Sequence, residues 1–164
     1  MEQGLDRVSW ADKKERKVWK KVSEQDLASL ASELKAILVK PTVIILSGEV
    51  GVGKTTFTKE FIGNSGDVHS PSYSLINEVG SFAHADFYRI EDSEELIHLE
   101  ISLYLEGKQF FIVEWGLPYA TQLRKEIDQR FDFFELHLDI SHDAIDRTED
   151  APTRDFILYE MIEL

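Results

Sequence analysis

Residues 43–55 read V-I-I-L-S-G-E-V-G-V-G-K-T, so that an apolar, β-branched run leads directly into the pattern G-x-x-x-x-G-K-[ST] at residues 48–55. Glycines let the backbone curl until successive N–H groups point inward at phosphate oxygens, and the following helix adds the positive end of its dipole. We therefore predict a phosphate-binding loop in which Lys54 reaches the β- and γ-phosphates and the Thr55 hydroxyl binds Mg²⁺. The alternative is a glycine-rich turn that holds no nucleotide, but a turn alone would not require the Lys-Thr pair.

The sequence around this loop has the expected flanking elements. Residues 42–46 are apolar on both faces, which is typical of a buried parallel strand. Residues 55–62 have a helical pattern that ends at Gly63. The residues that we expect to bind the nucleotide are Gly48, Glu49, Val50, Gly51, Val52, Gly53, Lys54, Thr55 and Thr56.

Length and composition favour a globular protein. The chain has 164 residues, is 43% hydrophobic and contains no cysteine, which removes disulfides and thiol catalysis. We expect residues 1–14 to be a mobile extension and residues 15–164 to form a single domain. No apolar run is long enough to span a bilayer, and the charged N-terminus does not resemble a signal peptide, so we expect a soluble, cytoplasmic protein with no membrane contact.

Charge is distributed unevenly along the chain. The formal net charge of −13 argues against an independent nucleic-acid binder, because phosphate contacts require a basic surface. Residues 1–21, however, carry seven basic and four acidic side chains, against 11 basic and 27 acidic in the remainder. This basic segment could touch RNA or an acidic partner, but such runs are usually solvated surfaces.

Periodicity predicts further elements along the chain. The predicted strands are at 17–22, 74–79, 81–90, 110–113, 134–140 and 156–162, and the predicted helices follow Ser23 and span 93–99 and 119–127. The strand at 134–140 alternates apolar and polar residues, which favours a half-exposed, antiparallel strand at a sheet edge. The fold class is therefore α/β: a P-loop NTPase-like, mostly parallel sheet flanked by helices, with antiparallel edge strands.

Two acidic residues are candidates for the chemistry of the site. Glu114 ends a continuous apolar strand, as a Walker B acid does, and open α/β sheets bind ligands at that edge. Asp86 shares a strand face with His84 and Tyr88, which we expect to be presented together. We assign Glu114 to the Mg²⁺ ligands, and Asp86 either to a second metal-ligand position or to orienting the attacking water. The alternatives are a solvent-facing Asp86 and a capping or edge role for Glu114.

Missing motifs narrow the class of nucleotide protein. There is no N-K-x-D motif of the kind expected in a guanine-specific domain, so we favour ATP over GTP. A small-molecule kinase normally closes an arginine-bearing lid over the transferred phosphoryl group. The later arginines are scattered and form no obvious lid in the sequence, at Arg124, Arg130, Arg147 and Arg154.

Four motifs in order resemble a known family. They are the loop at 48–56, S-P-S-Y-S-L at 70–75, H-A-D-F-Y-R at 84–89 and V-E-W at 113–115. In this order and spacing, from about Lys17 to the C-terminus, they resemble the TsaE family of P-loop ATPases in bacterial tRNA threonylcarbamoyladenosine biosynthesis.

The resemblance implies a function and assigns roles to residues. It implies a mostly parallel α/β sheet, ATP with Mg²⁺, and slow hydrolysis that is stimulated by the partners TsaD and TsaB, which act at adenosine 37 of tRNA. The protein would then meet tRNA only through that complex. By position, Lys54, Asp86 and Glu114 would be catalytic, and Thr55, Glu114 and Asp86 would hold the metal. Ser70, Pro71 and Ser72 would form a switch-like loop, Trp115 would neighbour the site, and Ser23 and Glu24 would lie by the adenine.

Two other functions remain open at this stage. The same phosphate loop would suit a small-molecule kinase. The acidic body with its basic N-terminal segment would suit a nucleotide-dependent interaction module without significant hydrolysis. The sequence also departs from the family at Ser72, where Thr is usual, at Glu49-Val50, where Asp-Leu is usual, and at Glu100, where a glycine is common.

Overall fold

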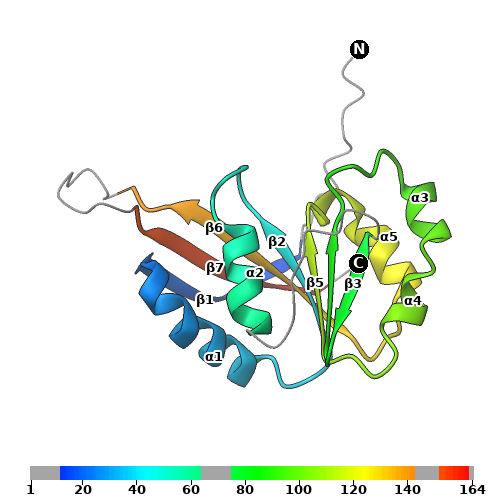
Figure 1. The fold of residues 1–164 in the computed structure, drawn as a ribbon, viewed down its shortest axis with the longest axis horizontal. Helices are drawn as coiled ribbons and strands as arrows, with labels where there is room; N and C mark the ends of the chain where they lie inside the picture. Colours follow the sequence, from blue (N-terminus) through cyan, green and yellow to red (C-terminus); the bar gives the residue numbers. More distant parts are fainter. Residues whose placement is uncertain (1–11, 64–74, 143–151, 163–164) are drawn as a thin grey trace, which may run out of the picture.

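A seven-stranded mixed sheet with helices on both faces forms the core of the structure, a computed structural model that describes residues 12–63, 75–142 and 152–162 (Figure 1). The strand order is β1-β7-β6-β2-β5-β4-β3. The strands are β1 (Lys13–Val22), β2 (Thr42–Ser47), β3 (Ile76–Val79), β4 (Phe82–Asp86), β5 (Phe110–Glu114), β6 (Asp132–Ile140) and β7 (Arg154–Met161). The helices are α1 (Leu27–Ile37), α2 (Lys54–Ile62), α3 (Ser93–His98), α4 (Ile101–Tyr104) and α5 (Ala120–Glu126), with short 3₁₀ turns at Glu24–Asp26 and Leu117–Tyr119.

The sheet is parallel at its centre and antiparallel outside it. β2 pairs in parallel with β5 and β6, and β4 pairs in parallel with β5. β3 is antiparallel to β4, and β7 is antiparallel to both β6 and β1. The predicted antiparallel strands at the edges are therefore confirmed, whereas the mostly parallel sheet is seen only in the four central strands.

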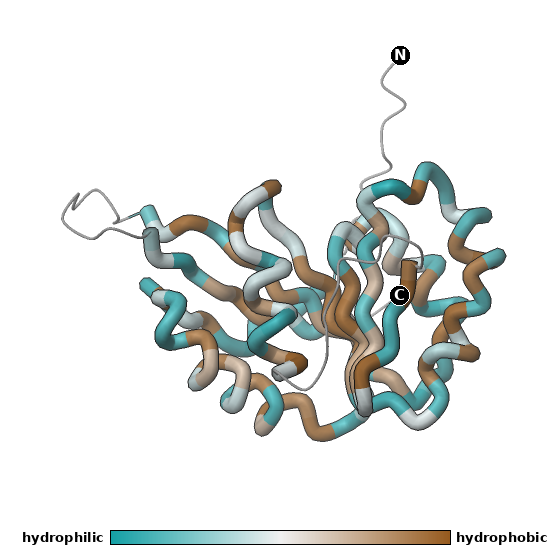
Figure 2. The backbone as a smooth tube through the Cα atoms, in the orientation of Figure 1, coloured by the Kyte–Doolittle hydropathy of each residue, from teal (hydrophilic) through white to brown (hydrophobic). Residues whose placement is uncertain are grey.

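Two apolar clusters, one on each face, hold the helices to the sheet. Alternate residues of β2 divide between the two clusters. Ile44 packs in the cluster with α1 and α2, which includes Phe57 and Phe61 of α2, whereas Val43 packs in the cluster with α3, α4 and α5. Figure 2 shows hydrophobic residues concentrated along the central strands. This two-sided burial explains why β2 and β5 are continuous apolar runs rather than alternating ones.

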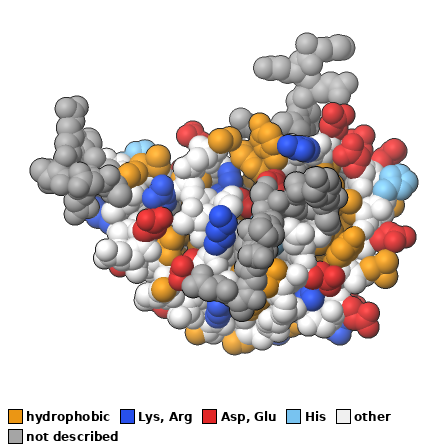
Figure 3. All heavy atoms as spheres, viewed as in Figure 1, with side chains coloured by type: hydrophobic (Ala, Val, Ile, Leu, Met, Phe, Trp, Pro, Cys, Tyr) orange, Lys and Arg blue, Asp and Glu red, His pale blue; other side chains and the backbone are white. Residues whose placement is uncertain are grey.

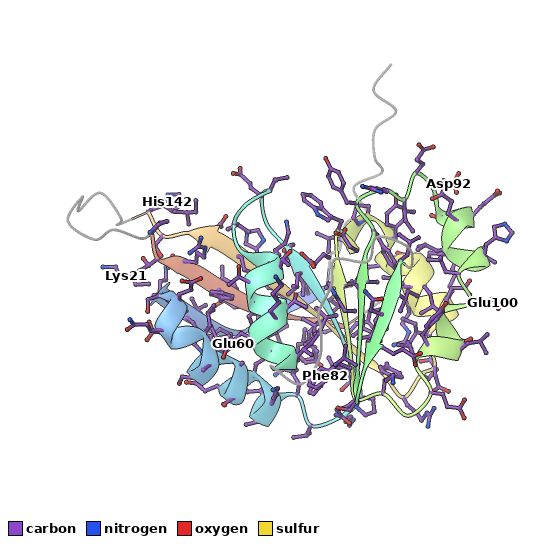
Figure 4. The ribbon with its side chains drawn as sticks, in the orientation of Figure 1. Lys21, Glu60, Phe82, Asp92, Glu100 and His142 are labelled. Carbon is purple, nitrogen blue, oxygen red and sulfur yellow. The ribbon has the colours of Figure 1, made fainter. Side chains whose placement is uncertain are left out.

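Local sequence signals start and stop the helices as expected. The Asp26 carboxylate accepts hydrogen bonds from the backbone N–H of Ser23 at 2.9 Å and from its hydroxyl at 2.8 Å, which confirms the predicted start of the first helix. α2 ends at Gly63, whose φ of +85° suits glycine. Asp92 caps α3, and Glu100 lies between α3 and α4 with φ at +51° (Figure 4). The turn after α3 is thus left-handed even without a glycine.

Three predicted strands differ most from the observed ones. β1 begins at Lys13, four residues before the predicted start, and β4 ends at Asp86 rather than at residue 90. The strand predicted as an antiparallel edge, at 134–140, is β6, which lies between β2 and β7 and is parallel to β2. Its polar residue Glu135 is only 2% exposed, because Lys13 and the Ser47 hydroxyl pair with it across the sheet.

The basic residues of β1 are largely paired within the protein. Lys13 lies 3.2 Å from Glu135, Lys17 lies 2.7 Å from Glu33, and Arg16 pairs with Glu160. These pairs give the cations partners within the sheet and in α1.

On the opposite side of the molecule, acidic side chains gather over α3 (Figure 3). Among the helices that the structure describes, none has the length and apolar character needed to cross a bilayer.

Candidate functional site

The phosphate loop lies between the end of β2 and the start of α2, as the sequence predicts. Gly48, Gly51 and Gly53 have φ angles of +134°, +80° and +111°, which L-residues rarely adopt. A Cβ atom on Gly48 would lie 2.4 Å from the carbonyl oxygen of Leu138, so β6 closely supports the start of the loop. The loop therefore has the backbone that a phosphate cradle requires.

Lys54 is the first residue of α2 and lies folded over the loop. Its Nζ donates hydrogen bonds to the carbonyl oxygens of Gly48 at 2.6 Å and Glu49 at 3.4 Å, and lies 3.8 Å from the centroid of the Trp115 ring. Burial lowers the pKa of Lys54 from its usual range, and the nearby carboxylates Glu114 and Asp86 act in the opposite direction. A phosphate in the loop would replace these weaker partners with a full negative charge.

Glu114 is fixed by a hydrogen bond to each carboxylate oxygen. The Thr55 hydroxyl donates to Oε1 at 2.9 Å, and His84 Nε2 lies 2.7 Å from Oε2. Both Glu114 and His84 are under 5% exposed. β4 and β5 place them side by side, since Asp86 and Glu114 are register partners and His84 is two residues before Asp86. The pair of Thr55 and Glu114 is the arrangement expected of a Walker A hydroxyl and a Walker B acid.

Asp86 and Trp115 complete an open cleft above the loop. The cleft is lined by Val50, Gly51, Gly53, Lys54, Thr55, Thr56, Asp86, Glu114 and Trp115. Asp86 is half-buried and accepts a hydrogen bond from the backbone N–H of Tyr88 at 2.9 Å. Trp115 has φ at +59°, a strained conformation for a large side chain, and its ring packs 5.2 Å from that of Tyr88. Hydroxyl and carboxylate oxygens converge here, which are the ligands that Mg²⁺ prefers.

The predicted grouping of His84, Asp86 and Tyr88 is wrong. His84 is buried, Asp86 is half-buried at the end of β4, and Tyr88 lies beyond the strand and is 66% exposed. Both faces of β4 are covered, so His84 packs inside against Glu114 rather than facing solvent. His84 is thus a buried strand histidine that is hydrogen-bonded to Glu114.

A second pocket adjoins the loop on the side away from Glu114. It is a small hollow, with a cavity volume of about 40 Å³. The lining residues are Val22, Ser23, Glu24, Leu27, Gly53, Thr56, Arg154 and Phe156. The pocket lies between the C-terminal end of β1, the start of α1 and the phosphate loop. Ser23 and Glu24, which are expected to lie by the adenine, are therefore close to the loop.

The predicted switch-like loop is not part of the described structure, and one residue near the site was not predicted from the sequence. Ser70, Pro71 and Ser72 lie outside the described residues. Arg154, grouped with scattered arginines in the sequence, lies against the loop and lines the second pocket. No local pattern could indicate this, because Arg154 and Gly53 are about one hundred residues apart.

Comparisons with known proteins agree with this architecture. The family model described as "Threonylcarbamoyl adenosine biosynthesis protein TsaE" matches residues 21–148. A relative from Bacillus subtilis is 35% identical over 116 residues, 66% of this chain and 72% of the relative. A relative from Aquifex aeolicus is 35% identical over 102 residues, 57% and 71% of the two chains. Both are named tRNA threonylcarbamoyladenosine biosynthesis protein TsaE.

A solved structure has the same fold. The crystal structure of YdiB from Bacillus subtilis superimposes with a TM-score of 0.53 and covers 92% of this chain and 88% of its own. The two sequences are 24% identical in this alignment, so the similarity is one of fold.

Proposed function

Because this chain belongs to the TsaE family of threonylcarbamoyl adenosine biosynthesis proteins, we propose that it is an ATP-binding and ATP-hydrolysing component of the bacterial machinery that modifies adenosine 37 of tRNA. Hydrolysis would be slow in the protein alone and stimulated by the partners TsaD and TsaB. The protein would act in the cytoplasm and meet tRNA only through these partners, because its net charge of −13 disfavours direct binding of nucleic acid.

One observation carries this proposal: the Thr55 hydroxyl donates to Glu114 at 2.9 Å directly beside Lys54. P-loop hydrolysis depends mainly on positioning and charge neutralisation, and Lys54, Thr55 and Glu114 are groups that can contribute to both. Lys54 would neutralise the β- and γ-phosphates. The N–H groups of residues 48–56 would cradle the phosphate chain, and Trp115 would line the cleft beside it.

The donor set fits Mg²⁺. Thr55 and Glu114 would hold the ion, with Asp86 as a further ligand or as the group that orients the attacking water. When bound, Mg²⁺ would neutralise charge on the phosphates during transfer. The nucleoside would occupy the second pocket, next to Ser23 and Glu24. Ser70, Pro71 and Ser72 remain the proposed switch-like loop.

The test is ATP hydrolysis by the purified protein, alone and with cognate TsaD and TsaB. We expect slow turnover alone, a marked rise with the partners, and loss of that rise in Lys54→Ala and Glu114→Ala. Lys59→Ala is the matched control, since Lys59 is exposed and lies outside the cleft on the same helix. A wild-type protein that binds ATP but shows no response to matched partners would overturn the role in the complex.

A further inference from the structure

We propose that Arg154 recognises the nucleoside of the bound nucleotide, an inference that rests on the proposed ATP site. Arg154 is the first residue of β7, and its Nε donates a hydrogen bond to the carbonyl oxygen of Val52. Its Nη1 donates to the carbonyl oxygen of Pro152 at 3.1 Å. These two bonds hold the guanidinium against the second half of the phosphate loop.

The close approach depends on a glycine. A Cβ atom on Gly53 would lie 3.1 Å from Arg154 Nε, so the guanidinium would have to shift by a few tenths of an ångström. Gly53 thus serves two purposes: its φ of +111° suits the loop, and its missing side chain leaves room for the guanidinium. The arginine is therefore part of the wall that the loop presents to the second pocket.

The position of the pocket puts Arg154 near the junction between the phosphate chain and the nucleoside of a bound nucleotide. Gly53 and Thr56 are its neighbours on the loop, and the other lining residues come from β1, β7 and the start of α1. Lys54, Thr55 and Glu114 lie on the other side, in the cleft suited to phosphates and metal. A nucleotide with its terminal phosphates at Lys54 would extend its nucleoside past Thr56 into the pocket that Arg154 lines.

The chemistry of the pocket suits a base and ribose. Val22, Leu27 and Phe156 offer apolar surface, and Arg154 adds a planar cation that can stack on an aromatic ring or donate N–H groups to ring nitrogens and hydroxyls. Two carbonyl anchors fix the guanidinium before the ligand arrives, which lowers the entropic cost of binding. Among the described residues, Nη2 of Arg154 makes no hydrogen bond, so that group is available to a ligand.

The rival explanation is that Arg154 only supports the loop through Val52. The two roles separate when ATP is compared with inorganic triphosphate, each with Mg²⁺, because triphosphate fills the phosphate positions and has no nucleoside. We expect Arg154→Ala to weaken ATP binding about tenfold or more, because one or two hydrogen bonds to a charged group are lost. The affinity for triphosphate should stay within about twofold of that of the wild type. Arg154→Lys should recover part of the loss, because lysine keeps the charge but not the planar fork.

Calorimetric titration of the full chain would give these affinities. Arg130→Ala is the control, because Arg130 is exposed and pairs with the neighbouring Asp128. Equal losses for ATP and triphosphate, or no loss for ATP, would overturn the assignment. Lys54→Ala should weaken both ligands. If the wild type binds neither ligand, the proposed ATP site is wrong. If the wild type binds ATP and Arg154→Ala binds it with the same affinity, only the proposed role of Arg154 is wrong.

Discussion

His84 Nε2 lies 2.7 Å from a carboxylate oxygen of Glu114 in a setting where both side chains are under 5% exposed. The second oxygen of Glu114 accepts from the Thr55 hydroxyl. The acid proposed to hold Mg²⁺ is therefore oriented from two sides, by a residue of the phosphate loop helix and by a residue of the neighbouring strand.

Removing the histidine should slow hydrolysis without removing the nucleotide. In His84→Gln, the amide can fill much of the same space but holds Glu114 less firmly, and loss of a group that orients a metal ligand typically costs about 10- to 100-fold. We expect partner-stimulated kcat to fall by this order while the affinity for ADP without metal stays within about twofold. His98→Gln, on the exposed side of α3, is the control. An unchanged kcat would mean that Thr55 alone is enough to orient Glu114.

Substitutions of Glu114 and Asp86 should differ in how they change the effect of Mg²⁺ on ATP affinity. Glu114 contacts Thr55 directly, whereas Asp86 is half-buried at the end of β4. Glu114→Gln should abolish most of the gain in ATP affinity that Mg²⁺ provides. Asp86→Asn should retain that gain and reduce turnover, if Asp86 orients water. Titration of ATP with and without Mg²⁺ measures the first effect, and hydrolysis the second. A loss of Mg²⁺ dependence in both variants would instead make Asp86 a metal ligand.

Gly48 should be the least replaceable glycine of the loop. A Cβ atom there would meet the Leu138 carbonyl oxygen at 2.4 Å, and the φ of +134° is itself strained for alanine. We expect Gly48→Ala to lower the free energy of unfolding by about 3 kcal/mol. Gly51→Ala is the matched comparison, because its φ is also positive but no atom lies within 4 Å, and about 1 kcal/mol is expected. Urea unfolding measures both; equal losses would show that β6 does not constrain Gly48.

Asp155 should give the protein a stability contribution that acid removes. Burial acts to raise the pKa of Asp155, but hydrogen bonds from the Lys21 backbone N–H and the Ser141 hydroxyl outweigh it, and the pKa lies below its ordinary 3.8. Because the folded state binds the proton more weakly than the unfolded state, this contribution is fully present above about pH 3.8 and disappears as the pH falls through the lowered pKa.

Asp155→Asn should therefore be less stable than wild type at pH 7, by about 1 kcal/mol for two weakened hydrogen bonds, and the difference should shrink below about pH 3.8. Urea unfolding at a series of pH values measures it, with Glu106→Gln, at an exposed position, as the control. A difference that does not change with pH would contradict the assignment to the carboxylate.

The sequence predicts the centre of this fold better than its margins. The run at 43–46 and the loop after it form β2, the phosphate loop and α2 as expected, since apolar burial and glycine conformations are local signals. The sequence pattern misplaces β6, because Glu135 looks like a solvent-facing residue in the sequence. Its partners Lys13 and Ser47, which allow it to be buried, are distant along the chain. The position of Glu114 can be predicted from the apolar strand that it ends. The contact of Arg154 with the loop cannot, because it depends on the pairing of β7 with β6 and β1.

The pairing of β1 with β7 has a consequence for how the chain is made. β1 is synthesised first and β7 last, and the two are neighbours in the sheet. While the chain emerges from the ribosome, β1 lacks its partner strand until β7 has been synthesised, more than a hundred residues later. In that interval the lysines of β1 would disfavour pairing with strands of other chains. The phosphate loop needs β6, because Gly48 lies close to Leu138, and the second pocket is complete only when Arg154 and Phe156 have been added. The wall of the second pocket is therefore the last part of the proposed site to be synthesised.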